Sequence, residues 1–167
     1  LKALKYQVDS DVQFFGLEDA WNLEGSKFKI EWTFTGIDNK VKAGKHVVSD
    51  PFTVQLTSED RCCECHLKCM FDDKGAIGIY IMLDSAPDTL KSVCLEGSSI
   101  TNKANSSTMK DVTRSFPSES YANVGSGRGW AGLITKDSLE NFKQGDGSIK
   151  ISACIKMKRP DTFRCVS

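Results

Sequence analysis

The sequence predicts an all-β protein with the architecture of an antiparallel β-sandwich. Several short segments alternate apolar and polar residues with a period of two, which is the pattern of strands that bury one face. Clusters of Gly, Pro, Asp and Asn separate these segments, and only one short stretch has helical character. A chain of 167 residues with ordinary apolar content is long enough for one domain with a normal core.

The domain is expected to begin at residue 27. Residues 1–26 show heptad-like apolar spacing, but it persists for only about two heptads, fewer than a coiled coil requires. We expect this segment to be an N-terminal extension that packs on the domain or is partly disordered. The domain is predicted over residues 27–160, because Pro160 ends the last strand, and residues 161–167 form a C-terminal tail.

Four strands are predicted in the first half of the domain, the first of which ends at Gly36. The core-facing residues of the first three are Phe28, Ile30, Trp32 and Phe34, then Phe52, Val54 and Leu56, then Cys65, Leu67, Cys69 and Phe71. The fourth strand, Ile77–Leu83, is almost continuously apolar. Its odd-numbered residues are expected to pack inward, so that Tyr80 and Met82 point out of the core.

The second half of the domain contains fewer clear strands. Val93–Leu95 is predicted as a short strand, whereas Ile100–Ser115 is rich in Ser, Asn and Lys and is predicted as a loop. Thr135–Phe142 is the one convincing helical segment, a turn or two in length. After a turn at residues 144–147, Ile149–Met157 alternates apolar residues with Lys and Ser and is the cleanest strand of the sequence.

The stretch Ser118–Leu139 combines a tyrosine, several glycines and an Arg-Gly-Trp step. Because glycine tolerates unusual backbone angles and close approach of another chain, this stretch is predicted to be a loop. Trp130 within it has two open interpretations. Either its large amphipathic ring belongs to a binding surface, or it fills one end of the sandwich.

Charge and hydropathy exclude several classes of partner. The formal net charge is zero, whereas proteins that bind nucleic acid or anionic membranes need a basic excess. No apolar run approaches the length of a membrane span, and the first residues lack the order of a signal peptide. We therefore expect no nucleic-acid partner and no membrane partner.

The seven cysteines indicate a reducing compartment. An odd number leaves at least one thiol unpaired, and the four at positions 62, 63, 65 and 69 are too close together to join distant parts of the chain. The expected location is therefore the cytoplasm or the nucleus. A glycosylation sequon begins at Asn105, but it would matter only in a secreted protein.

No metal site, cofactor or catalytic site is expected. The segment Cys62–Cys69 contains zinc-ligand residue types, but a strand places Cys65 and Cys69 on the face opposite His66, and no second ligand pair follows. His46 and His66 are the two histidines, and neither lies in a nucleophile motif. The glycines of residues 125–129 lack the Gly-Lys-Ser/Thr ending of a phosphate loop.

The sequence resembles a MATH (TRAF-like) domain from about residue 27 to residue 159. Five landmarks that resemble those of the family occur in the expected order. They are Trp32 and Phe34, then Gly44 and Ser49-Asp50-Pro51-Phe52, then Leu67-Lys68-Cys69 with Gly75 and Ile79–Leu83 before Pro87, then Gly129-Trp130-x-x-Leu133-Ile134-x-x-Asp137, and finally Asp146–Ile151.

This resemblance implies an eight-stranded antiparallel sandwich of the TRAF/MATH type whose shallow groove binds short extended peptides. The chain is most similar to the speckle-type POZ (BTB) branch, whose groove binds Ser/Thr-rich segments of ubiquitin-ligase substrates. The implied function is substrate recognition for a cullin-type ubiquitin ligase, with the cullin contacted by a BTB domain outside this chain. The implied peptide-binding residues are Tyr80, Leu95, Tyr121, Arg128, Gly129 and Trp130.

One position departs from the family pattern. Arg128 stands where the family has the Trp of its Trp-Gly-Phe segment, so a guanidinium replaces an aromatic wall. We expect peptide preference to shift toward an acidic or phosphorylated side chain. The rings of Tyr80, Tyr121 and Trp130 are expected to share one face, beside a strand to which an extended peptide adds main-chain hydrogen bonds.

Two other functions remain open for the same fold. In a trimeric receptor-signalling adaptor of the TRAF type, Leu1–Val12 would be the end of a coiled coil. In an extracellular MATH module, as in meprin-like proteases, disulfides and a glycan on Asn105 are expected.

Overall fold

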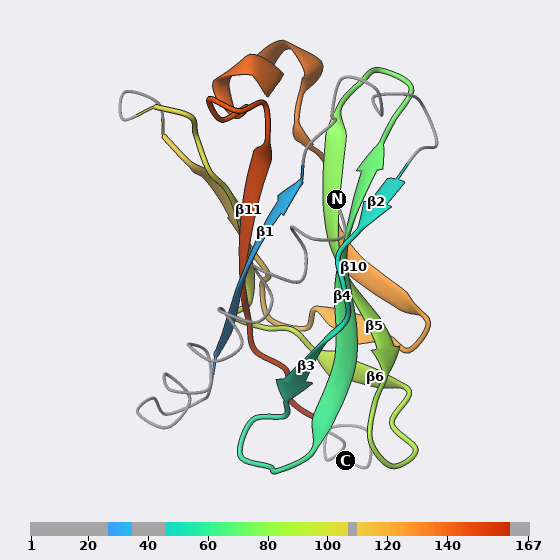
Figure 1. Ribbon diagram of the computed structural model, residues 1–167. Helices are drawn as coiled ribbons and strands as arrows, with labels where there is room; N and C mark the ends of the chain where they lie inside the picture. Colours follow the sequence, from blue (N-terminus) through green and yellow to red (C-terminus); the bar gives the residue numbers. More distant parts are fainter. Residues whose placement is uncertain (1–26, 35–45, 107–109, 161–167) are drawn as a thin grey trace.

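A computed structural model describes residues 27–34, 46–106 and 110–160 of the chain (Figure 1). Within these residues the strands are β1 (Phe28–Phe34), β2 (His46–Val48), β3 (Phe52–Gln55), β4 (Cys62–Phe71), β5 (Ile77–Ser85), β6 (Ser92–Cys94), β7 (Ser99–Asn102), β8 (Val112–Ser115), β9 (Tyr121–Asn123), β10 (Ser126–Ile134) and β11 (Ile149–Ile155). A short 3₁₀ helix, η1 (Lys136–Asn141), confirms the predicted helical piece. The predicted extension over residues 1–26, the strand end at Gly36, the Gly44 landmark and the tail lie outside the described residues.

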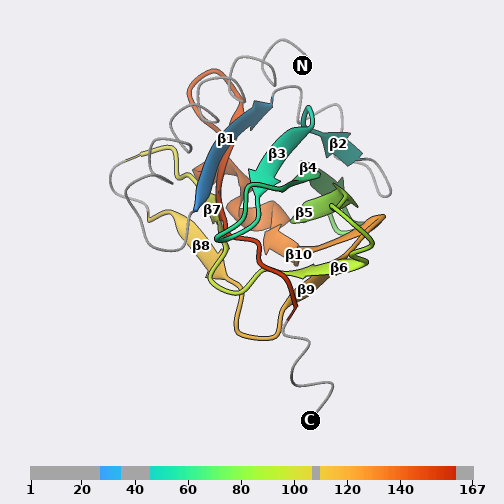
Figure 2. The same ribbon diagram turned by 90° about the horizontal axis from the view of Figure 1, so that it is seen from below.

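The described strands form two main sheets that lie face to face (Figure 1). The β11 sheet has the order β1-β11-β7-β8, and the β5 sheet has the order β10-β5-β4-β2, with β3 also paired to β4. All of these strand pairs are antiparallel. A separate two-stranded ribbon of β6 and β9 lies beside β10, as the view in Figure 2 shows. The all-β prediction is therefore confirmed.

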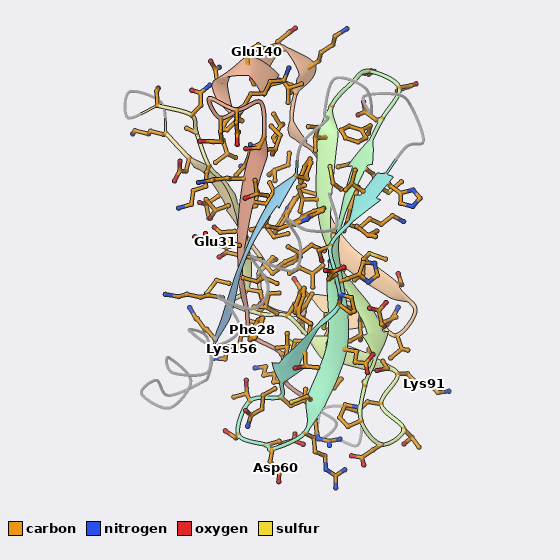
Figure 3. The ribbon with its side chains drawn as sticks, in the orientation of Figure 1. Phe28, Glu31, Asp60, Lys91, Glu140 and Lys156 are labelled. Carbon is orange, nitrogen blue, oxygen red and sulfur yellow. The ribbon has the colours of Figure 1, made fainter. Side chains whose placement is uncertain are left out.

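The core lies between the two sheets and follows the predicted alternation. In β1, Ile30, Trp32 and Phe34 are fully buried, and in β5 the odd-numbered residues from Ile77 to Leu83 are fully buried. On the other side of β1, the labelled side chain of Glu31 points away from the β5 sheet (Figure 3). Two-fold periodicity thus places one face of each strand against the opposite sheet, as strand geometry requires.

Two predicted loops form strands in the structure. Residues 100–115 were expected to be a loop, but β7 and β8 pair within this segment, and the hydroxyl groups of Thr101 and Thr113 lie 2.9 Å apart across them. Because β8 lies at the edge of the sheet, most of its residues stay exposed, and its polar composition resembles a loop. The glycine-rich stretch around Trp130 likewise forms β10, which pairs with β5.

Ion pairs anchor the last described residues to one end of the sandwich. The Nε of Arg159 donates to Oε2 of Glu59 at 2.7 Å, and its Nη2 donates to Oε1 of Glu59 at 2.9 Å and to Oδ2 of Asp88 at 2.8 Å. Arg61 also pairs with Asp88. These contacts join the β3–β4 turn and the β5–β6 loop to the segment that follows β11.

Candidate functional site

β10 is the last strand of the β5 sheet. Among the described residues it pairs with β5 alone, and its backbone register runs from Ser126 opposite Leu83 to Trp130 opposite Ile79 before a bulge that ends at Ile134. A strand at the end of a sheet presents unpaired N–H and C=O groups along its outer side. Such a row of groups can pair with an extended segment from another chain.

The register of β10 places its two most distinctive side chains toward the inside of the sandwich. Arg128 lies opposite Ile81, and Trp130 lies opposite Ile79. Directly opposed residues of an antiparallel pair project from the same face, and both isoleucines are fully buried. Arg128 and Trp130 therefore project from the core-side face of the sheet at its open edge, where Arg128 is exposed and Trp130 is half-buried.

Trp130 connects the two sheets at this edge. Its ring lies against the ring of Phe116, with centroids 4.4 Å apart and an interplanar angle of 34°. Phe116 directly follows β8, the end strand of the β11 sheet, and is itself buried. Part of the Trp130 side chain thus packs on the core cluster, as the second interpretation expects, and part stays exposed on the edge strand.

The opposite face of β10 carries no side chains at two successive outward positions. Gly129 lies opposite Tyr80, and Gly127 lies opposite Met82. A Cβ atom on Gly129 would overlap the Ile79 carbonyl oxygen and lie 2.6 Å from the Tyr80 Cα, and one on Gly127 would lie 2.5 Å from the Met82 Sδ. The side chain of Met82 therefore extends over bare β10 backbone, and glycine is required at both positions.

A shallow pocket lies beside Tyr80 on this outward face. Its volume is about 180 Å³, and it is lined by Met70, Phe71, Asp72, Ala76, Gly78, Tyr80, Ala131 and Gly132. Small residues form much of its floor, since a Cβ on Gly78 would approach the Tyr80 ring at 3.1 Å and the Ala131 Cα at 3.0 Å. The pocket extends from β5 to the bulged part of β10.

The structure separates the predicted site residues into three groups. Arg128, Gly129 and Trp130 lie together on β10, and Tyr121 is 37% exposed on the neighbouring strand β9. Tyr80 lies on the face of the sheet opposite to Trp130, so the expectation that all three rings share one face is wrong. Leu95 is fully buried in the core and cannot contact a ligand at the surface.

Arg114 is a candidate contact residue that the sequence did not reveal. It lies opposite the buried Ile100 in the β7–β8 pair, and thus projects from the core-side face of the edge strand β8, two residues before Phe116. Its side chain is exposed, and no ion pair joins Arg114 or Arg128 to another residue in the described ranges. The alternation of Val112, Arg114 and Phe116 was the available signal, and it was hidden in a segment predicted as a loop.

The cysteine cluster lies on β4 as predicted, with Cys63, Cys65 and Cys69 buried and Cys62 exposed. Burial raises the pKa of Cys63 to about 11 and raises that of Cys65 well above its usual value, so both remain neutral thiols. His66 lies on the other face and contacts Asp84, with Nδ1 and Oδ2 2.8 Å apart. Within the described residues no group of three or more potential ligands could hold a metal ion.

No protein-family model matches the sequence, and no curated protein matches it either. In the part of the chain that the structure describes, no helix is long and apolar enough to cross a membrane. The interpretation of the β10 edge therefore depends on its geometry and on the chemistry of its side chains.

Proposed function

We propose that this chain is a peptide-binding adaptor domain that holds a short extended segment of a partner protein against the edge of β10. The observation that supports this most directly is that the end strand β10 itself carries the partly exposed Trp130. A peptide that pairs with β10 would satisfy main-chain groups of the edge, and its alternate side chains would contact the two faces of the sheet.

The arrangement of strands also supports a MATH-type sandwich. The β11 sheet contains four strands, and the β5 sheet contains β10, β5, β4 and the interrupted pair of short strands β2 and β3. Counting that pair as one gives eight strands in the two main sheets, the number that the resemblance implies, with the β6–β9 ribbon outside them. Kinship with the speckle-type POZ branch further suggests Ser/Thr-rich peptides from substrates of a cullin-type ubiquitin ligase, bound in the cytoplasm or nucleus. Contact with a cullin would require a BTB domain elsewhere in the protein.

The affinity of such a site is expected to be modest. A short peptide along one strand buries less than about 1,200 Å² in total, which is the lower limit for stable protein complexes. Trp130 would supply the largest apolar contact, and Tyr121 on β9 would add a ring with a hydrogen-bonding tip. A modest affinity of each single site is compatible with adaptor function, because linking several copies raises the overall affinity.

The first prediction tests this function by fluorescence anisotropy with labelled Ser/Thr-rich peptides. Trp130→Ala should raise the dissociation constant by about tenfold or more, as expected for the loss of a central aromatic contact. Tyr121→Ala should have a smaller effect of the same sign, since Tyr121 lies on the neighbouring strand β9 and not on β10 itself.

Glu31→Ala is the matched control, because Glu31 is exposed on the outward face of the other sheet and should leave binding unchanged. Thermal unfolding of each variant separates loss of contact from loss of fold. Normal binding by both Trp130→Ala and Tyr121→Ala, with the fold intact, would show that the peptide does not lie along β10.

A further inference from the structure

We infer that the peptide held by β10 alternates acidic and apolar side chains, with the acidic ones facing Arg128 and the apolar ones facing Met82 and Tyr80. This inference rests on the proposed function and specifies its ligand. It follows from the different chemistry of the two faces along the same edge strand.

Strand addition sets which peptide side chain meets which face. A peptide residue directly opposite Arg128 projects from the core-side face, and the next residue, opposite Gly129, projects from the outward face. Two kinds of surface therefore contact alternate positions of one short peptide. A sequence of uniform character would fit only one of them.

The core-side face of the edge is cationic. Arg128 lies on this face of β10, Arg114 lies on the core-side face of β8 at the end of the other sheet, and neither strand contains an acidic residue. Both guanidinium groups are exposed, and neither has an ion-pair partner among the described residues. A guanidinium presents parallel N–H donors that match the two oxygens of a carboxylate, so a glutamate or aspartate is the side chain that suits this face.

The outward face of the edge is apolar and lacks β10 side chains. Because Gly127 and Gly129 expose only backbone there, the first side chains a peptide meets are those of the next strand, Met82 and Tyr80. Adjacent strands lie about 4.8 Å apart, so the peptide backbone would be about 10 Å from β5. A leucine and a methionine that extend toward each other span this distance.

The pocket beside Tyr80 gives this face a second apolar contact. It opens over Gly78 and is bounded by Ala131 and Gly132 of β10, so it extends up to the strand with which the peptide would pair. Met70 also lines it, and methionine adapts its shape to different partners. Lys68 lies on the same face but on β4, one strand farther from the edge than Tyr80. An acidic side chain at an outward position would therefore lose hydration beside Met82 and Tyr80 without a cation on β5 or β10 to pair with there.

The experiment measures binding of labelled peptides in which glutamate alternates with leucine, glutamine with leucine, or glutamate with serine. The glutamate–leucine peptide should bind most tightly. Arg128→Gln should weaken it about fivefold, the effect of removing one exposed charge pair, and should change glutamine–leucine binding less than about twofold. Arg128→Glu should abolish the preference for glutamate–leucine and favour a lysine–leucine peptide instead.

Lys150→Gln is the matched control, since Lys150 is an exposed cation on the outward face of the β11 sheet and should affect none of these peptides. Equal binding of glutamate–leucine and glutamine–leucine peptides to the wild type would overturn the acidic half of the inference. Equal binding of glutamate–leucine and glutamate–serine peptides would overturn the apolar half. Failure of the proposed function would look different, because no peptide, including the Ser/Thr-rich ones, would bind in a way that depends on Trp130.

Discussion

The outward faces of the two sheets have opposite character, although both belong to strands with the same alternating pattern. On the β11 sheet, the outward residues of β1 and β11 include Lys29, Glu31, Thr33, Lys150 and Ser152. On the β5 sheet, the strand next to β10 presents the half-buried side chains of Tyr80 and Met82 beside two glycines of β10, and β4 adds Met70 together with the polar side chains of His66 and Lys68, one strand farther from the edge.

The outward face of the β11 sheet contains hollows, but their polar lining favours water over a partner protein. Two adjoining hollows of about 330 and 370 Å³ share Glu31, Lys103 and Ser152 in their lining. Charged and hydroxyl groups are well hydrated there, so burial of this face by a partner would be costly. The side chains of methionine and tyrosine, and the bare backbone of β10, lose little hydration free energy on contact with another chain. The difference supports the proposal that a partner binds on the side of the β5 sheet, at its end strand β10.

The largest expected effect comes from filling one of the glycine positions. Gly129→Ala would drive a Cβ into the Ile79 carbonyl and toward the Tyr80 Cα, and should lower the free energy of unfolding by about 3 kcal/mol. Gly145→Ala is the matched control, because a Cβ there would meet no atom within 4 Å, and it should change stability by less than about 0.5 kcal/mol. Chemical denaturation measures both. Equal stability of the two variants would mean that β10 does not approach β5 this closely.

A smaller effect is expected from truncating outward side chains on the two sheets. Met82→Ala should lower the free energy of unfolding by about 1 kcal/mol, since its half-buried side chain packs over β10. Glu31→Ala on the β11 sheet should lie within about 0.5 kcal/mol of the wild type. Urea titrations followed by tryptophan fluorescence can resolve this difference. If Glu31→Ala lowers the free energy of unfolding as much as Met82→Ala does, the outward side chains of the two sheets do not differ in how much their packing stabilises the fold.

The smallest expected effect concerns the ion pairs at the end of the sandwich, outside either face. Hydrogen bonds from Arg159 lower the pKa of Glu59 below its ordinary value of 4.5 and that of Asp88 below 3.8. Since the folded-state pKa values are the lower ones, the stabilisation is complete above the ordinary values and is lost as the pH falls through the folded-state values. Stability should therefore decline in acid below about pH 5 in the wild type, and less steeply in Arg159→Gln.

Melting temperatures recorded across this pH range check the expectation, and Arg114→Gln, which removes an arginine without an ion-pair partner among the described residues, is the control. If the melting temperatures of the wild type and Arg159→Gln change identically with pH, the ion pairs of Arg159 contribute nothing to stability. The pairing of β10 with β5 involves no titrating pair and should persist throughout.

The candidate site was partly accessible from the sequence. Trp130 and Arg128 stood out because a large ring and a guanidinium among glycines are unusual, and Tyr80 was correctly assigned to the outward side of its strand. That Tyr80 and Trp130 lie on opposite faces of the sheet could not be inferred, since it depends on which residues of β5 and β10 lie opposite each other. Leu95 was misplaced because Val93, Cys94 and Leu95 are all buried, so this segment does not alternate between core and surface. Arg114 was concealed in a segment whose polar composition resembles a loop.

The sequence by itself determined which segments alternate apolar and polar residues, and therefore which side chains of β1, β4, β5 and β11 are buried. This was possible because the two-residue period of a strand is a local property of the backbone. Only the tertiary structure decided that residues 126–134 form a strand at all, that glycines face Tyr80 and Met82, and that Trp130 lies against Phe116 of the other sheet. Cross-strand register and sheet stacking depend on contacts between residues far apart in the chain, and the alternation within one strand does not specify which residues of another strand lie opposite.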